Sequence, residues 1–247
     1  MSREILANEL YQKLYGKTQQ ANDQEYQEIM KRYIYGDVYQ HGHLNDQLRE
    51  LILIVVQATN HTLKALKKHT LAGIRVGLSP IAMKEALYQC SPYIGYGKVD
   101  EALDAMNEVF QQEGIPLSLE SQSTTHEETR FDKGFAVQSA AFGQERIQSG
   151  HDQAPQELKH IQNYLSAHCF GDFYTRKGLD LKTRELLTFV MLASLGGCEN
   201  QLRAHTKANI RVGNTREILI ETITQCQPYI GFPRTLNAIT IINEITL

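Results

Sequence analysis

Apolar residues recur at intervals of three and four along most of the chain, and no long segment alternates apolar and polar residues as a strand would. The segment from Leu186 to Leu195 is apolar at nearly every position, which predicts a helix buried on most sides. Gly196 and Gly197 then interrupt the pattern, and a second helix is expected from Cys198 to Val212. The pattern therefore predicts an all-α fold.

Residues that favour helix ends support this division. Gly213 follows the predicted second helix and suits the left-handed conformation that often ends a helix. Thr215 is then placed to cap the next helix. The first part of the chain has the same design: Gly77 ends a helix, Ser79 caps the next one, and Pro80 occupies its first position.

The chain consists of two related halves. Each half contains an Arg-Glu pair, a histidine further on, a glycine that ends a helix, and a segment of the form Gln-Cys-x-Pro-Tyr-Ile-Gly. These features begin at Arg49, His69, Gly77 and Gln89 in the first half and at Arg184, His205, Gly213 and Gln225 in the second. The offset is 135 residues at the arginines and 136 at the glycines, so one residue was gained or lost between the Glu and the His. With a last helix expected at 99–111 and at 236–246, the pattern predicts two helical lobes related by a pseudo-two-fold axis.

A polar segment separates the two halves. Residues 112–129 are rich in Ser, Thr, Glu and Gln and include a glycine and a proline, a composition typical of a linker. We therefore divide the chain into a first repeat at 1–115, a linker at 116–129 and a second repeat at 130–247.

Composition narrows the possible partners. A net charge of −3 on 247 residues gives no electrostatic reason to expect a nucleic acid or an anionic membrane surface. The longest strongly apolar runs, such as Leu51 to Val56, are far too short to cross a membrane. Four cysteines in a chain of this length do not resemble a secreted disulfide framework, and Cys90 and Cys226 are expected to be buried free thiols. We expect a soluble cytoplasmic protein.

The second half holds a candidate catalytic group. Cys198, Gln201 and His205 are spaced to share one face of the predicted helix, and Glu185 on the preceding helix is placed to fold back against that face. A histidine can act as an acid or a base, and a carboxylate can orient it or shuttle its proton. Cys198 in the first helical turn would feel the positive end of the helix dipole, which favours the thiolate.

The first half keeps only part of this group. The matching positions are Glu50, Thr62, Ala65 and His69, so the cysteine is absent while the Glu and the His remain. A single Glu or His on a helix is more often a surface residue or a satisfied core residue, and a single Cys is more often a small buried apolar residue. The repetition of both Glu and His in two diverged halves favours a functional role for this pair.

Five motifs of the second half carry a resemblance to a known family. They are Arg184-Glu185-Leu186-Leu187, Leu195-Gly196-Gly197, Gln201-Leu202-Arg203-Ala204-His205, Val212-Gly213-Asn214-Thr215-Arg216-Glu217 and Tyr229-Ile230-Gly231-Phe232-Pro233. Together they resemble the carboxymuconolactone decarboxylase family, part of a superfamily that also holds the alkyl hydroperoxidase D proteins. The resemblance covers nearly all of the second half, and the first half matches more loosely. It implies an all-α fold in which two tandem helical-hairpin repeats form an alkyl hydroperoxidase D-like pseudo-dimer. It also implies a homotrimer with pseudo-hexameric packing.

One activity of that superfamily is a thiol peroxidase. The peroxidase branch has the order Glu, Cys-x-x-Cys-x-x-x-His, and here Cys198 and His205 keep their spacing. Gln201 stands where the second, resolving cysteine would be, so the usual disulfide cannot form within the motif. Peroxiredoxin-type activity through Cys198 is therefore our second hypothesis.

The other activity needs no cysteine. The decarboxylase branch removes carbon dioxide from a γ-lactone acid and shifts a double bond as a proton is delivered. If this resemblance holds, His205 is the acid or base and Glu185 positions it, while Arg203 or Arg211 would hold the substrate carboxylate.

We rank a cofactor-free lyase acting on a small lactone or carboxylic acid first, the Cys198 peroxidase second, and a non-catalytic oligomeric binding protein third. His41 and His43 stand two residues apart without a carboxylate cluster beside them, which is a weak signal for a metal site. The resemblance to the decarboxylase branch implies that no metal or organic cofactor is required. We expect the chemistry in the second half, where the motif is fuller, with Glu50 and His69 as an equivalent or decayed site.

Overall fold

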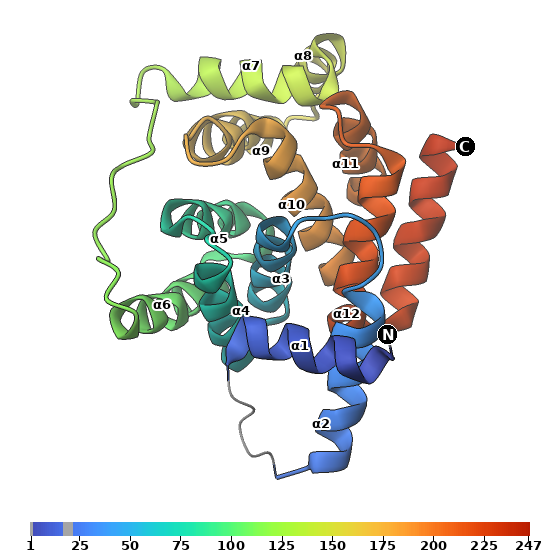
Figure 1. Cartoon of the computed structure of the whole chain (residues 1–247). Helices are drawn as coiled ribbons and strands as arrows, with labels where there is room; N and C mark the ends of the chain where they lie inside the picture. Colours follow the sequence, from blue (N-terminus) through green and yellow to red (C-terminus); the bar gives the residue numbers. More distant parts are fainter. Residues whose placement is uncertain (1, 17–21) are drawn as a thin grey trace.

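The computed structural model describes residues 2–16 and 22–247, and within them every regular element is helical (Figure 1). The elements of the first repeat are α1 (Arg3–Tyr15), α2 (Gln24–Lys31), η1 (Arg32–Val38), α3 (Asp46–Asn60), α4 (Leu63–Arg75), α5 (Pro80–Ile94) and α6 (Tyr96–Gln112). Those of the second repeat are α7 (Arg130–Phe142), α8 (Gln144–Asp152), α9 (Lys159–Tyr164), η2 (Leu165–Tyr174), α10 (Leu181–Leu195), α11 (Glu199–Arg211) and α12 (Arg216–Thr246). The predicted all-α fold with two repeats is confirmed. None of the helices in these described ranges is long and apolar enough to cross a membrane.

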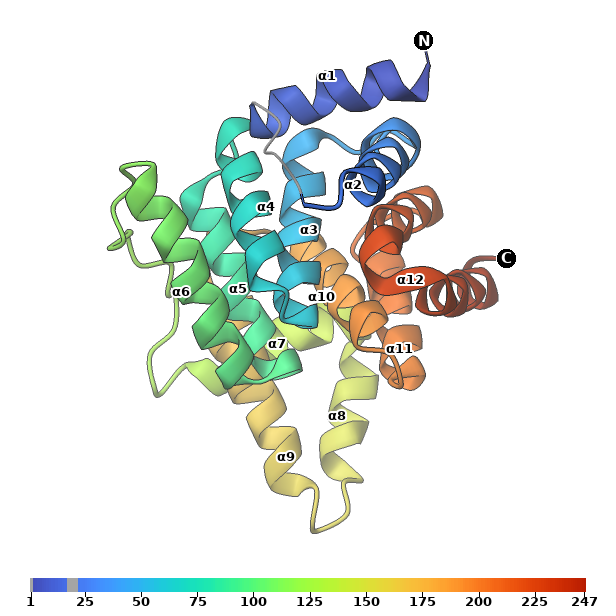
Figure 2. The same cartoon turned by 90° about the horizontal axis from the view of Figure 1, so that it is seen from below.

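The two repeats share one hydrophobic core. Helices α3 and α10 contact each other at the centre of the molecule, as the two views show (Figures 1 and 2). Helix α10 also packs against α5 of the first repeat, and α3 packs against α12 of the second, so the contacts across the repeats are reciprocal. Every residue of 184–194 in α10 is buried, which confirms the helix predicted to be buried on most sides.

The connection between the repeats runs along the outside of the molecule. Helix α6 ends at Gln112 and α7 begins at Arg130, and the segment between them crosses one side of the structure without forming a helix (Figure 1). The division into units at 1–115 and 130–247 stays a prediction, because residues of both units contribute to the same core.

Most of the predicted helix ends agree with the structure, and one differs. Thr215 caps α12 by accepting a hydrogen bond from the backbone N–H of Ile218 at 3.3 Å, and Pro80 is the first residue of α5. Ser79 precedes α5 but makes no capping hydrogen bond with its side chain, so that prediction was wrong. The span of α12 consists of two helices separated at Gly231, whose φ of 79° and ψ of 164° are not helical, so a last helix follows the Tyr-Ile-Gly segment as α6 follows Gly95 in the first repeat.

Each repeat also has a leader hairpin in which two helices cross closely. In the second repeat, a Cβ atom on Gly171 of η2 would lie 2.2 Å from the backbone oxygen of Arg130 in α7. In the first repeat, a Cβ on Gly36 would lie 2.3 Å from the backbone oxygen of Arg3. The aspartate after each glycine pairs with the same arginine at 2.8 Å. Only glycine permits the two backbones to approach this closely, so a glycine is required at both Gly36 and Gly171.

We expect Gly171→Ala to lower the free energy of unfolding by about 1–3 kcal/mol, because the new methyl group would overlap a backbone atom that cannot move aside. Gly150→Ala is the matched control, since a Cβ there has no neighbour within 4 Å in helix α8. That change should stabilise the protein by about 0.5–1 kcal/mol through helix propensity. Urea denaturation measures both, and equal effects of the two substitutions would contradict the close crossing.

Candidate functional site

Glu185 and His205 form a buried pair in the second repeat. Glu185 lies in the second turn of α10 and His205 lies in the middle of α11, so the hairpin of these helices brings them together. The carboxylate Oε2 is 2.8 Å from the imidazole Nδ1, and Glu185 is fully buried. Asn209 fixes the pair further, since its amide donates to the backbone oxygens of both residues at 2.9 and 2.8 Å. The hydrogen bond at Nδ1 leaves Nε2 for a substrate proton.

Glu50 and His69 form the same pair in the first repeat. Their Oε2 and Nδ1 atoms are also 2.8 Å apart, and the two side chains, on α3 and α4, are buried. The structure therefore brings together both predicted Glu–His pairs. In each pair the other carboxylate oxygen, Oε1, is buried and has no hydrogen-bond partner among the described residues. A buried acceptor without a partner costs about 1–3 kcal/mol, which is more often tolerated at a functional site than in a plain core.

Each histidine is enclosed by aromatic rings from both repeats. The ring of His205 lies 5.9 Å from that of Tyr93 in the first repeat and 5.0 Å from that of Phe142 in α7. His69 has the reciprocal arrangement, with Tyr229 of the second repeat at 5.5 Å and Tyr15 at 6.5 Å. Neither site is complete within one repeat. Tyr93 and Tyr229 stand at the same position of the Tyr-Ile-Gly segment in the two halves, and this repetition is the signal in the sequence that marks them.

Burial keeps these tyrosines protonated. It is the main cause that raises the pKa of Tyr93 and of Tyr229 well above the ordinary range, and the neighbouring phenols and thiol and the carboxylates of Glu185 and Glu50 raise it further. Both hydroxyl groups are therefore hydrogen-bond donors or acceptors at neutral pH and not phenolates.

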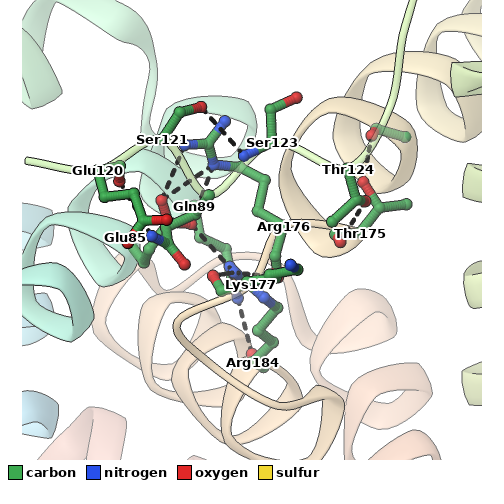
Figure 3. A network of polar contacts seen from close by, with 12 residues as sticks. Glu85, Gln89, Glu120, Ser121, Ser123, Thr124, Thr175, Arg176, Lys177 and Arg184 are labelled. Carbon is green, nitrogen blue, oxygen red and sulfur yellow. Dashed lines mark hydrogen bonds and ion pairs between the residues drawn. The ribbon is translucent and has the colours of Figure 1, made fainter.

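A buried ion cluster holds the start of α10, one residue before Glu185. Glu85 of the first repeat accepts hydrogen bonds from Arg176 at 2.9 and 3.0 Å and from Arg184 at 3.1 Å (Figure 3). Arg184 is fully buried and also donates to Gln89 at 2.9 Å. Burial lowers the pKa of Arg184, and the Glu85 carboxylate opposes that shift. Residues of the linker lie beside this cluster (Figure 3). Because Glu85 and Gln89 of the first repeat hold Arg184, the first repeat positions the neighbouring Glu185 of the second.

Cys198 does not join the Glu–His pair. It precedes α11 at the N-cap position, and its thiol donates to the backbone oxygen of Leu192 at 3.2 Å. Burial, and then the nearby Glu199, raises the pKa of Cys198, with Arg234 opposing the shift. Burial therefore works against the thiolate expected at this helix start, and a redox role of Cys198 stays a prediction. The cavity that Cys198 lines contains neither Glu185 nor His205.

The two predicted substrate-binding arginines lie in different surroundings. Arg203 is at the surface and pairs with Glu244 at 2.8 Å. Arg211 lines an open groove of about 840 Å³ together with Phe142, the residue whose ring lies against His205. Arg211 is thus the better placed of the two, and its role stays a prediction. The described part of the chain contains no group of three or more His, Cys, Asp or Glu side chains that could hold a metal ion, and His41 and His43 form no such site.

Comparison with known proteins assigns the family. The family model described as carboxymuconolactone decarboxylase matches residues 24–108 and again residues 159–244, one match in each repeat. The chain belongs to the carboxymuconolactone decarboxylase family. The two matches contain both Glu–His pairs and both of the tyrosines that face them.

Two relatives named as decarboxylases are little more than half as long as this chain. The 4-carboxymuconolactone decarboxylase of Acinetobacter baylyi is 29% identical over 120 residues, which are 49% of this chain and 89% of that protein. The nitrosuccinic acid decarboxylase of Metarhizium robertsii is 26% identical over 111 residues, or 45% of this chain and 77% of that protein. A crystal structure from Burkholderia xenovorans, provisionally assigned as a gamma-carboxymuconolactone decarboxylase subunit, matches 99% of this chain and 98% of its own. Its TM-score of 0.57 at 18% identity supports the fold.

We expect Glu85→Gln to lower the free energy of unfolding by about 3–5 kcal/mol, because it leaves the buried Arg184 guanidinium without a counter-charge. Glu244→Gln removes a carboxylate from an exposed pair instead and should change stability little. Chemical denaturation of the two variants measures the difference. Equal losses would show that the buried cluster contributes no more than the surface pair.

We expect iodoacetamide to alkylate Cys198 at pH 7 more slowly than it alkylates a free cysteine, because the raised pKa leaves less thiolate. Glu199→Gln should speed the reaction and Arg234→Gln should slow it, since these charges act on the thiol in opposite directions. Mass spectrometry of the Cys198 peptide gives the rates. A Cys198 that reacts faster than free cysteine would contradict this account.

Proposed function

We propose that this protein is a cofactor-free carboxy-lyase that acts on a small lactone or carboxylic acid through its buried Glu–His pairs. The observation that supports this most is the 2.8 Å contact between a buried carboxylate and Nδ1 of a histidine, present in both repeats. Relatives named as decarboxylases match the chain over about one repeat, which agrees with this reaction type.

The reaction needs one proton at a defined place. When the C–C bond to the departing carboxylate breaks, its electron pair forms a new C=C bond and carbon dioxide leaves. The electron pair of the original C=C bond then takes a proton from Nε2–H of the protonated histidine. The histidine becomes neutral and regains its proton from solvent, while the glutamate at Nδ1 holds the ring in place and stabilises its charged form. The tightly enclosed ring keeps this geometry fixed.

The two other hypotheses gain less support from the described residues. A peroxidase that uses Cys198 would need a reactive thiolate, and the raised pKa works against one. A non-catalytic binding protein would have no need for two buried carboxylates that each leave one oxygen without a partner. A homotrimer with pseudo-hexameric packing belongs to the proposal as an expectation from the family, and a cytoplasmic location as an expectation from the composition.

We expect the double variant His69→Gln/His205→Gln to lose about 10²–10⁴-fold of the rate of carbon dioxide release from 4-carboxymuconolactone, because it removes both general acids. The two single variants then show how much of the rate of carbon dioxide release depends on each repeat. His160→Gln is the control, since His160 is exposed on α9. A double variant as active as the wild type would refute the acid role of the histidines, and a wild type that releases no carbon dioxide would refute this substrate.

A further inference from the structure

A cavity of about 650 Å³ lies between the repeats beside the first Glu–His pair. Thr62, the residue directly before α4, and Ala65 of α4 line it, seven and four residues before His69 on the same face. Tyr229 of the second repeat also lines the cavity, and its ring packs against His69 at 5.5 Å. The cavity therefore opens on the aromatic wall of the first-repeat pair.

The charged residues that line this cavity are all positive. Lys98 comes from the first repeat and Arg234 from the second, and they occupy equivalent positions 136 residues apart. No Asp or Glu is among the residues that line it. Lys98 donates to the backbone oxygen of Thr59 at 3.1 Å, and Arg234 donates to that of Ser194 at 2.6 Å. Each cation keeps further N–H groups that can bind an anion.

A buried amide adds an unused donor. Gln57 lines the same cavity and is only 2% exposed, and its Nε2 has no hydrogen-bond partner among the described residues. Its Oε1 accepts from the hydroxyl of Thr62, which leaves the amide nitrogen as the free end. An unpartnered buried donor is costly, and an oxygen atom of a bound ligand would satisfy it.

The second repeat lacks this donor. Leu192 is the equivalent of Gln57, and Cys198 is the equivalent of Thr62. The amide, the hydroxyl and the adjoining cavity thus occur together only beside the first-repeat pair within the described residues. The sequence motif is fuller in the second half, whereas these groups for binding a ligand lie beside the pair of the first repeat.

We propose that this cavity binds a small organic anion bearing carboxylates, held by Lys98, Arg234 and Gln57 across the boundary of the two repeats. The bound anion lies against Tyr229 and therefore beside the Glu50–His69 pair. Its use as the substrate of that pair rests on the proposed function, whereas its binding does not.

Isothermal titration with succinate tests the cavity. Lys98→Gln, Arg234→Gln and Gln57→Leu should each raise the dissociation constant at least about tenfold, because each removes a charge or a donor. Lys182→Gln, which removes an exposed positive charge elsewhere, should leave it unchanged. Neutral succinamide should not bind, and inorganic phosphate should bind more weakly than succinate. Thermal unfolding of each variant first shows that it is folded.

The outcomes separate this proposal from the proposed function. Unchanged succinate affinity in all three variants, or no binding of succinate up to about 20 mM, would overturn the cavity as an anion site. Phosphate binding as tight as succinate binding would overturn the carboxylate assignment. Because titration needs no turnover, a protein that binds succinate as expected but releases no carbon dioxide would refute only the lyase.

Discussion

The packing of α3 against α10 is the constraint on which the rest of the structure depends. These two helices are buried on nearly all sides, and each is covered by the other repeat's helices as well as by its own. Glu50 and Glu185 are on these helices, so the packing of the two repeats buries both of them. The same joining brings Tyr93 to His205 and Tyr229 to His69. The same packing of the two repeats therefore forms both the core and the surroundings of the two Glu–His pairs.

Burying a carboxylate is unfavourable unless hydrogen bonds or opposite charges compensate. Here each glutamate has one such partner, the imidazole Nδ1, and one unpartnered oxygen. Hydrogen bonds to both oxygens of each carboxylate would stabilise the fold, but no carboxylate oxygen would then be left to accept a further hydrogen bond. The buried Arg184 donates to Gln89, to Glu85 and to the backbone oxygen of Arg176, which holds the chain directly before Glu185, although its Nε also has no partner among the described residues.

The Glu–His pair is the same in both repeats, but the residues around it differ. Tyr15 and Tyr35 share a hydrogen bond at 3.1 Å beside His69, whereas Phe142 and Phe170 stand at the equivalent positions beside His205. The second repeat has instead gained an asparagine that ties its Glu–His pair together. Such changes alter the polarity around the Glu–His pair and the access to it without moving the pair, and this is how a duplicated protein can give its two sites different ligands.

The sequence by itself determined the helical fold, the two repeats and both Glu–His pairs. Helical periodicity is a local property, and the repetition of a Glu and a His marks residues that must stay together. Only the tertiary structure decided which residues complete each site, because Tyr93 and Tyr229 reach the histidine of the other repeat across the repeat boundary. It also decided the state of Cys198, since the burial that raises its pKa comes from neighbours that no local pattern names.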